Sequence, residues 1–395
     1  MVETPIHKQA LLLTLISLSV WTLWNIVRHP PHPWADLSQG HHTDHFSHMN
    51  AARLFPRVGL DLWRRPVRDQ FRALTEQELA GMPEDIRAGG SWSGGVYFVP
   101  GWPTDKPLAI SWSGKPRPYP PGDLILVAPI AALYHFTPLS LAGANRLLMG
   151  WFIVLAHIAL FFFFVVFLEA KDSGAAWLGL FLVYGEVMHW TLEGFYDALV
   201  LAPLVLAARY LATRRGLATG VAYCLAAALH FRAYFFAPWA IYAAWLVVHD
   251  RAWRMWTWRH ALALTGAVLC AASSLYVFTL GWPSLRQWEP TNPVLLASLD
   301  HLNPRALNLL IVVVVLAAVL VWMRAWLDLA ILLWLSIALF TVRQTLPWHI
   351  LIPMAWLGAP VLRPLVRGVR LGFVMTAAAL VYGATVAPAW LWRLF

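Results

Sequence analysis

Charged residues are scarce in this 395-residue chain, where Asp, Glu, Lys and Arg make up 12% of the sequence and hydrophobic residues 59%. A soluble domain carries about a quarter charged residues, so the composition excludes an ordinary soluble protein and predicts a chain embedded in lipid. Tryptophan, by contrast, is abundant, with 24 copies. Its ring favours the boundary between membrane and water, which agrees with the same prediction.

Cysteine is also scarce, and both copies, Cys224 and Cys270, fall inside apolar segments. A disulfide framework and a cysteine-based zinc site are therefore not expected. The sequence lacks a glycine-rich nucleotide-binding motif and lacks a solvated run of Lys and Arg interleaved with aromatics. Despite the net charge of +9, nucleic acid is not an expected partner. The cations stand at the ends of apolar segments, which indicates topology control and contact with membrane lipid.

The apolar runs predict about 11 membrane spans, because a span needs about 20 residues at 1.5 Å each. We place them at residues 9–27, 139–168, 174–190, 195–212, 216–231, 233–249, 259–281, 305–323, 326–341, 346–365 and 371–392. The first run lacks a convincing small-residue cleavage site, so we expect an uncleaved span rather than a signal peptide. The expected fold class is an all-α integral membrane bundle.

The stretch from residue 28 to 121 is too rich in acids, Gly and Pro to cross a membrane. Within it, segments 44–56 and 67–80 are amphipathic and predict helices lying on the bilayer surface. Segment 122–136 is apolar but short and contains a proline, so we expect an interfacial helix on the same side as the loop. The chain then divides into a first span (1–27), a loop with juxtamembrane helices (28–138), a core transmembrane module (139–281) and a variable C-terminal transmembrane module (282–395).

The distribution of cations predicts the orientation of this arrangement. With a cytoplasmic N-terminus, the inner loops carry Lys171, Arg214, Arg215, Arg251, Arg254, Arg259, Arg324, Arg363, Arg367 and Arg370. The short outer loops carry only Arg232, Arg286, Arg305 and Arg343. This asymmetry follows the positive-inside rule and places the large loop outside the cytoplasm, on the outer face of the cytoplasmic membrane.

Several chemically capable groups then share the outer face. They are Asp44 in the large loop and, at outer span ends, Glu193, Asp197, His230, Arg232, Arg343 and His349. Ionisable groups at that depth are costly unless they serve a cavity or a partner. Their types suit transfer from a lipid-linked phosphate donor: a carboxylate takes a proton from an acceptor hydroxyl, and arginine and histidine hold the leaving phosphate.

Two motifs in the first half of the chain resemble a known family. The run TDHFSHMNAARLFPRVGLDLW, residues 43–63, resembles the first-loop motif of GT-C glycosyltransferases of the polyprenol-phosphate-mannose type, with an Asp shortly after span one. The run YPPGDLILVAPIAALY, residues 119–134, resembles the Tyr-Pro-Pro segment that ends this loop as a juxtamembrane helix. Residues 192–216 and 217–238 resemble the following outer loop and a small-residue span, so the resemblance covers about residues 9–250.

The resemblance implies a GT-C-like bundle that moves a sugar, mannose as first choice, from a polyprenyl-phosphate donor. The acceptor would be a glycolipid or cell-surface glycan, and the reaction one inverting displacement. Asp44 matches the family's general base, and Arg232 stands near its donor-phosphate position. The chain departs from the pattern where Glu193 and Gly194 replace Gly-Gln, and where His230 to Arg232 stand in place of a lysine.

Simpler interpretations stay open for each residue. Asp44 is also a suitable N-cap for the helix that follows it. Arg232 is also a suitable interfacial anchor, Glu193, Asp197, Arg343 and His349 are also ordinary loop residues, and Tyr119 before two prolines fixes loop geometry. The spacing of His41, Asp44, His45 and His48 allows a divalent cation, although a solvated histidine-rich turn is favoured over a metal site. The alternative function is a transporter or flippase of a lipid-linked sugar, against which the almost uninterrupted apolar runs at 139–168 and 305–323 argue.

Overall fold

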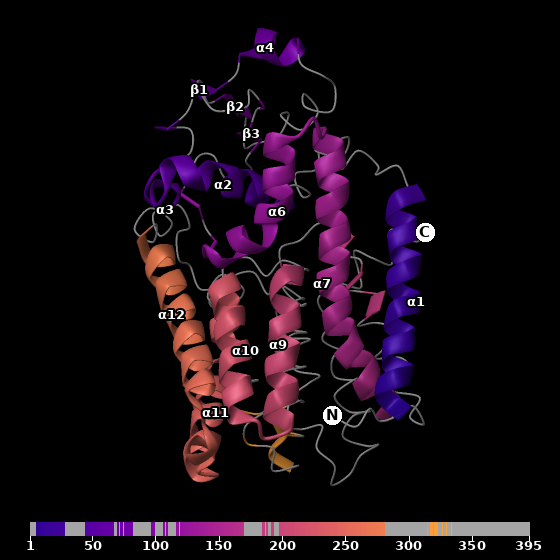
Figure 1. Ribbon diagram of the computed structural model, residues 1–395, viewed down its shortest axis with the longest axis vertical. Coiled ribbons are helices and arrows are strands. Elements are labelled where there is room, and N and C mark those ends of the chain that lie inside the picture. Colours follow the sequence, from indigo (N-terminus) through magenta and orange to yellow (C-terminus); the bar gives the residue numbers. More distant parts are fainter. Residues whose placement is uncertain are drawn as a thin grey trace.

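The computed structural model of the protein describes residues 5–27, 44–66, 119–169 and 197–280 without interruption. Shorter pieces are described between residues 69 and 117, 184 and 192, and 314 and 333. The predicted C-terminal module, residues 282–395, therefore lies almost wholly outside the described residues. The described part is a bundle of roughly parallel helices with a small loop domain at one end (Figure 1).

Three helices in the described part are long and apolar enough to cross a membrane. They are α1 (Pro5–Val27), α7 (Leu141–Glu169) through its segment Gly143–Val165, and α12 (Trp258–Leu280) through its segment Trp258–Val277. Shorter apolar helices are α6 (Gly122–Phe136), α9 (Asp197–Ala212), α10 (Gly216–Leu229) and α11 (Ala237–His249). The prediction of a membrane-embedded helical protein is confirmed, whereas the total of about 11 spans stays a prediction.

The core of the bundle is formed by α7, α9, α10 and α11. Its fully buried side chains include Ile153, Leu204, Ala226 and Trp239. The many alanines on α9 and α10 are buried, and small residues let helix backbones approach closely in lipid, where dispersion replaces the hydrophobic effect. By contrast, only 17% of the residues in the most apolar stretch of α1, and likewise of α12, are buried, so both helices lie at the edge of the described bundle.

A chain of hydrogen bonds joins α1 to α7 inside the bundle. The Trp21 indole N–H donates to the Tyr184 hydroxyl at 2.6 Å, and Ser17 Oγ lies 2.7 Å from both the Tyr184 hydroxyl and His157 Nε2. His157 Nδ1 must donate to the Ile153 carbonyl, 2.7 Å away, because a carbonyl only accepts. In a neutral imidazole Nε2 then accepts a hydrogen bond from the Ser17 hydroxyl. The Tyr184 hydroxyl in turn donates to Ser17 Oγ, so each hydrogen bond of this series has one donor and one acceptor.

The loop domain contains α2 (Asp44–Val58), α3 (Asp61–Arg64), α4 (Glu76–Ala80) and a three-stranded antiparallel sheet. The strands are β1 (Arg72–Ala73), β2 (Val96–Phe98) and β3 (Leu108–Ala109), paired in the order β1-β2-β3. The predicted helix at 44–56 is confirmed as α2. The predicted helix at 67–80 is wrong over its first part, where β1 pairs with β2, and only α4 remains of it. The sheet is an addition to the all-α fold that the sequence predicted.

The helix α6 lies beyond the ends of α9 and α10, at the end of the bundle where the loop domain gathers (Figure 1). This side of the bundle is called the loop end below. The 14-residue α10 is about 21 Å long, shorter than a hydrocarbon core of about 30 Å. The first residue of α6 packs directly on its C-terminal end. The interfacial position of segment 122–136 stays a prediction.

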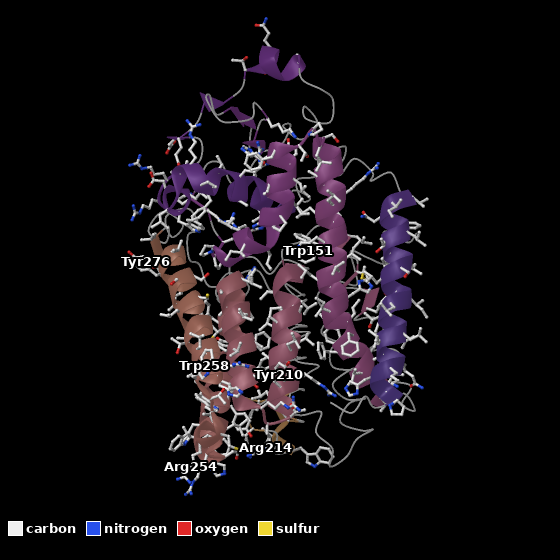
Figure 2. The ribbon with its side chains drawn as sticks, viewed as in Figure 1. Trp151, Tyr210, Arg214, Arg254, Trp258 and Tyr276 are labelled. Carbon is white, nitrogen blue, oxygen red and sulfur yellow. The ribbon has the colours of Figure 1, made fainter. Side chains whose placement is uncertain are left out.

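The turns at the opposite end of the bundle are tight and basic. Arg214, between α9 and α10, and Arg251, after α11, both adopt positive φ angles, of 55° and 51°. The 3₁₀ helix η4 (Ala252–Met255) leads from α11 into α12, while η3 (Phe231–Phe236) makes the corresponding turn at the loop end. In Figure 2, Arg214 and Arg254 lie at the lower end of the bundle, far from the loop domain.

Candidate functional site

The helix α2 begins at Asp44, the residue that the sequence singled out as a candidate base. An acidic residue at the first helical position is favoured by the partial positive charge of the helix N-terminus. The helix ends where Pro56 removes a donor and Gly59 takes a left-handed conformation, with the Gly59 N–H bonded to the Phe55 carbonyl at 2.8 Å. The structure describes the backbone of Asp44 but not its side chain.

One helical turn after Asp44, the side chain of His48 is completely buried. His48 Nδ1 and Arg117 Nη2 both bind Oδ2 of Asp123, near the start of α6. All three side chains have no exposed surface. We call His48, Arg117 and Asp123 the Asp123 cluster; it joins α2, the end of the loop and α6 at one point.

The charges within this cluster determine whether the Asp123 carboxyl is ionised. Burial alone raises the pKa of a carboxyl, but the positive charges of Arg117 and His48 and their hydrogen bonds outweigh it and hold the pKa of Asp123 below its ordinary value. Asp123 is therefore an anion at neutral pH. Its other oxygen, Oδ1, has no hydrogen-bond partner within the described part of the chain. A buried anion held through a single oxygen depends strongly on both partners.

Tyr119, before Pro120 and Pro121, connects the Asp123 cluster to the membrane helices. Its carbonyl accepts a hydrogen bond from the Trp63 indole at 2.7 Å, which fixes the turn against α3. Its ring centroid lies 4.4 Å from that of His48 and 6.3 Å from that of His230, the residue that ends α10. Tyr119 thus bridges a loop histidine and a span-end histidine, as well as fixing the loop geometry.

Gly122 explains why α6 can begin directly on α10. A Cβ at this position would lie 2.3 Å from the Ala228 carbonyl oxygen, a distance that no side chain tolerates. The same carbonyl accepts a hydrogen bond from Ser274 Oγ on α12, at 2.6 Å. The sequence Tyr-Pro-Pro-Gly-Asp therefore places a ring, a tight turn, a close helix contact and a buried anion within five residues.

A second set of basic residues attaches the loop to the far end of α6. Lys106 Nζ donates to the carbonyls of Tyr134, Thr137 and Leu139, at 2.6, 2.7 and 2.8 Å, and so caps the C-terminus of the helix. Arg53 on α2 lies over the Tyr134 ring, with 4.7 Å between the guanidinium carbon and the ring centroid. Both ends of α6 are therefore bound to the loop domain through cations.

The structure brings some of the predicted site residues together and leaves others undescribed. His230 is buried at the loop end, and Tyr119 lies between it and His48. The backbones of Arg232, in η3, and Asp197, at the start of α9, are described without their side chains. Glu193, Arg343 and His349 lie outside the described residues. For the metal alternative, His48 uses Nδ1 on Asp123, and no group of three or more His, Cys, Asp or Glu that could hold a metal occurs within the ranges described.

Arg117 and Asp123 were not among the site residues predicted from the sequence. The signal for Asp123 was present, because a lone acid at the start of the otherwise apolar run 122–136 is costly in an interfacial helix unless a cation partners it. The signal for Arg117 was weaker, since it is one of many loop cations. His48 was considered only as a metal ligand or a solvated residue, and its burial between α2 and α6 contradicts the solvated alternative.

Comparison of the chain with protein-family models, with curated proteins and with solved structures finds no match in any of the three.

Proposed function

We propose that the protein is a membrane glycosyltransferase that moves a sugar from a polyprenyl-phosphate donor to a lipid-linked or cell-surface glycan. The observation that carries the proposal is the place of Asp44, which begins α2 one turn before the buried Asp123 cluster. This cluster lies where the loop domain meets the bundle, and Tyr119 connects it to His230 at the end of α10. A general base positioned there meets a donor whose lipid tail stays in the bilayer.

The short helices at the loop end support a lipid-borne donor. Since α10 is about 21 Å long, its C-terminal end and His230 lie at or below the level of lipid headgroups when its other end is at the opposite surface. A phosphate in that zone is adjacent to the bilayer and also to the loop domain. The resemblance of segments 43–63 and 119–134 to GT-C enzymes points to the same class of donor.

In the proposed reaction the acceptor hydroxyl oxygen attacks the anomeric carbon of the donor as its proton passes to the Asp44 carboxylate. The bond between that carbon and the phosphate oxygen breaks, and polyprenyl phosphate leaves with the electron pair. The anomeric centre inverts in this single displacement. Arg232 is the proposed partner of the departing phosphate, and mannose is the first choice of sugar. The enzyme would lie in the cytoplasmic membrane with this site on the outer face.

The test is a transfer assay with purified protein, labelled polyprenyl-phosphate sugars and membrane glycolipid extract. Asp44→Asn is expected to lower the rate by about 10²–10⁴-fold, the contribution of a positioned general base. The matched control is Asp61→Asn, which changes an acid at the start of another loop helix, α3, and is expected to leave the rate within about twofold, since no proton transfer is assigned to it. Transfer that survives Asp44→Asn overturns the assignment of the base. Donor movement across vesicles without any transfer favours the transporter.

A further inference from the structure

The turn from α11 into α12 carries a group of basic and aromatic side chains that the proposed reaction does not use. It lies at the opposite end of the bundle from the loop domain. In Figure 2, Arg254 in η4 is at the lower end of the bundle, and Tyr276, near the other end of α12, lies well above it. We propose that it is a binding site for the headgroups of anionic phospholipids. We call it the η4 surface, which consists of Arg251, Trp253, Arg254, Met255, Trp258 and Arg259.

The charge of the η4 surface is not neutralised within the described part of the chain. The nearby acid, Asp250, is already bound by Arg214, with Nη2 2.9 and 3.2 Å from the two carboxylate oxygens. The hydrogen bond to Asp250 raises the pKa of Arg214. Arg251, Arg254 and Arg259 make no ion pair with any described residue. Three cations within nine residues therefore offer a net positive patch to a partner.

The apolar members of the η4 surface are well exposed. Met255 is 84% exposed, Trp258 70% and Trp253 53%. Each tryptophan carries an arginine over its ring: Arg254 over Trp253 and Arg259 over Trp258, both with 5.5 Å between the guanidinium carbon and the ring centroid. Exposed indole rings beside guanidinium groups match the interfacial zone of a bilayer, where rings lie among headgroups and cations meet phosphates.

A lipid fits this surface better than a protein or a nucleic acid, because it is continuous with lipid-facing helix surface. Ile241 and Val248 on α11 and Leu262 on α12 are 71%, 68% and 62% exposed. Val248 and Leu262 each stand three residues from a cation of the turn, Arg251 and Arg259 respectively. The acyl chains of a phospholipid can contact the apolar residues of α11 and α12 while its phosphate binds the cations of the turn, so one molecule occupies both surfaces. Selectivity for anionic headgroups follows from the net charge of the turn.

Local structure holds the turn in this shape. Arg251 adopts a left-handed conformation, and the Arg254 N–H bonds to the Arg251 carbonyl at 3.1 Å, which closes η4 directly after α11. Thr257 precedes α12, and its backbone N–H donates to His260 Nδ1 at 3.0 Å, in the manner of a capping box. The η4 surface is therefore a preformed site rather than a loose basic tail.

The experiment measures lipid selectivity on the full chain reconstituted in phosphatidylcholine bilayers. Spin-labelled phosphatidylglycerol and spin-labelled phosphatidylcholine report the association constant of each headgroup with the protein surface. The triple variant Arg251→Gln/Arg254→Gln/Arg259→Gln is expected to lower the preference for phosphatidylglycerol at least about threefold, since each surface cation contributes to anionic-lipid attraction. The matched control, Arg57→Gln/Arg64→Gln/Arg65→Gln, removes three exposed cations at the loop end and is expected to leave the preference unchanged. Equal losses in the two variants, or no loss in the first, overturn the proposal.

A second measurement uses the unaltered protein and so does not depend on the folding of a variant. Phosphatidylglycerol with a photoreactive group next to its headgroup is irradiated with the wild-type chain, and the crosslinked residues are mapped. Crosslinks within residues 250–260 are expected, and they should disappear when unlabelled phosphatidylglycerol is in excess. Crosslinks found only elsewhere overturn the proposal. Neither measurement depends on the sugar-transfer activity.

Discussion

At the loop end of the bundle, Asp123 is bound by Arg117 and His48 with all three side chains inaccessible to solvent. At the opposite end, Arg214 and Asp250 pair with 45% and 34% of their side chains exposed. The removal of one member of a buried ion pair leaves an uncompensated charge away from water. The removal of one member of an exposed pair leaves a charge that water solvates, and salt already screens such pairs. The same chemistry is therefore a structural requirement at one end and an ordinary surface feature at the other.

The largest expected difference in stability between the two ends comes from neutralising one acid at each. Asp123→Asn is expected to lower the free energy of unfolding by about 3–5 kcal/mol, because Arg117 stays buried without its counter-ion. Asp250→Asn is expected to lower it by less than about 1 kcal/mol. Unfolding of the purified protein in mixed detergent micelles, followed by circular dichroism, measures both. Similar losses for the two variants would mean that burial does not distinguish the two ends.

The close contact between α6 and α10 allows a purely steric test at the loop end. Gly122→Ala places a methyl group against the Ala228 carbonyl and is expected to cost about 1–3 kcal/mol of stability, the range for overpacking.

The control for this steric test is Gly266→Ala on α12, where an added Cβ meets nothing within 4 Å. It should be neutral or stabilise the protein by up to about 1 kcal/mol, because alanine favours a helix. The same unfolding experiment compares the two. A neutral Gly122→Ala variant would show that α6 can shift away from α10 without cost.

The interior of the bundle provides the smallest expected effect, since it is joined by neutral hydrogen bonds instead of charges. Ser17→Ala removes the link between His157 and Tyr184 and is expected to cost about 0.6 kcal/mol, and at most about 1.7 kcal/mol, as found for bonds between membrane helices. Thr14→Ala is the control on the same helix, because its hydroxyl bonds only to the Ala10 carbonyl within α1. A larger loss for Thr14→Ala than for Ser17→Ala would contradict the role of Ser17 in joining helices.

Hydropathy predicted the helices of the bundle well. The boundaries of α1, α9 and α11 agree with the predicted spans to within a few residues at either end. The reason is physical: in lipid a backbone must satisfy its own hydrogen bonds, so a long apolar run has few alternatives to a helix. The loop had more alternatives, and the pairing of β1 with β2 depends on a partner more than 20 residues away that local periodicity does not reveal.

The candidate site was predictable only in part. The position of Asp44 at a helix start and the placement of Tyr119 and His230 at one end of the bundle followed from local patterns and topology. The partnership of Asp123 with Arg117 and His48 did not, because it depends on how α2 packs on α6, and packing is decided by tertiary contact. Arg117 looks like any other loop cation until its burial is known.

The contacts of α2 and α6 also constrain the order in which the chain can fold during synthesis. His48 can bind Asp123 only after a further 75 residues have been synthesised. The turn that carries Asp123 can pack on Ala228, at the end of α10, only later still. At typical rates of synthesis, the interval between His48 and Ala228 is on the order of ten seconds. During that time α2 can pack on α6, but the first residue of α6 lacks the end of α10 on which it packs. The loop end therefore reaches its final arrangement only after α10 has been synthesised.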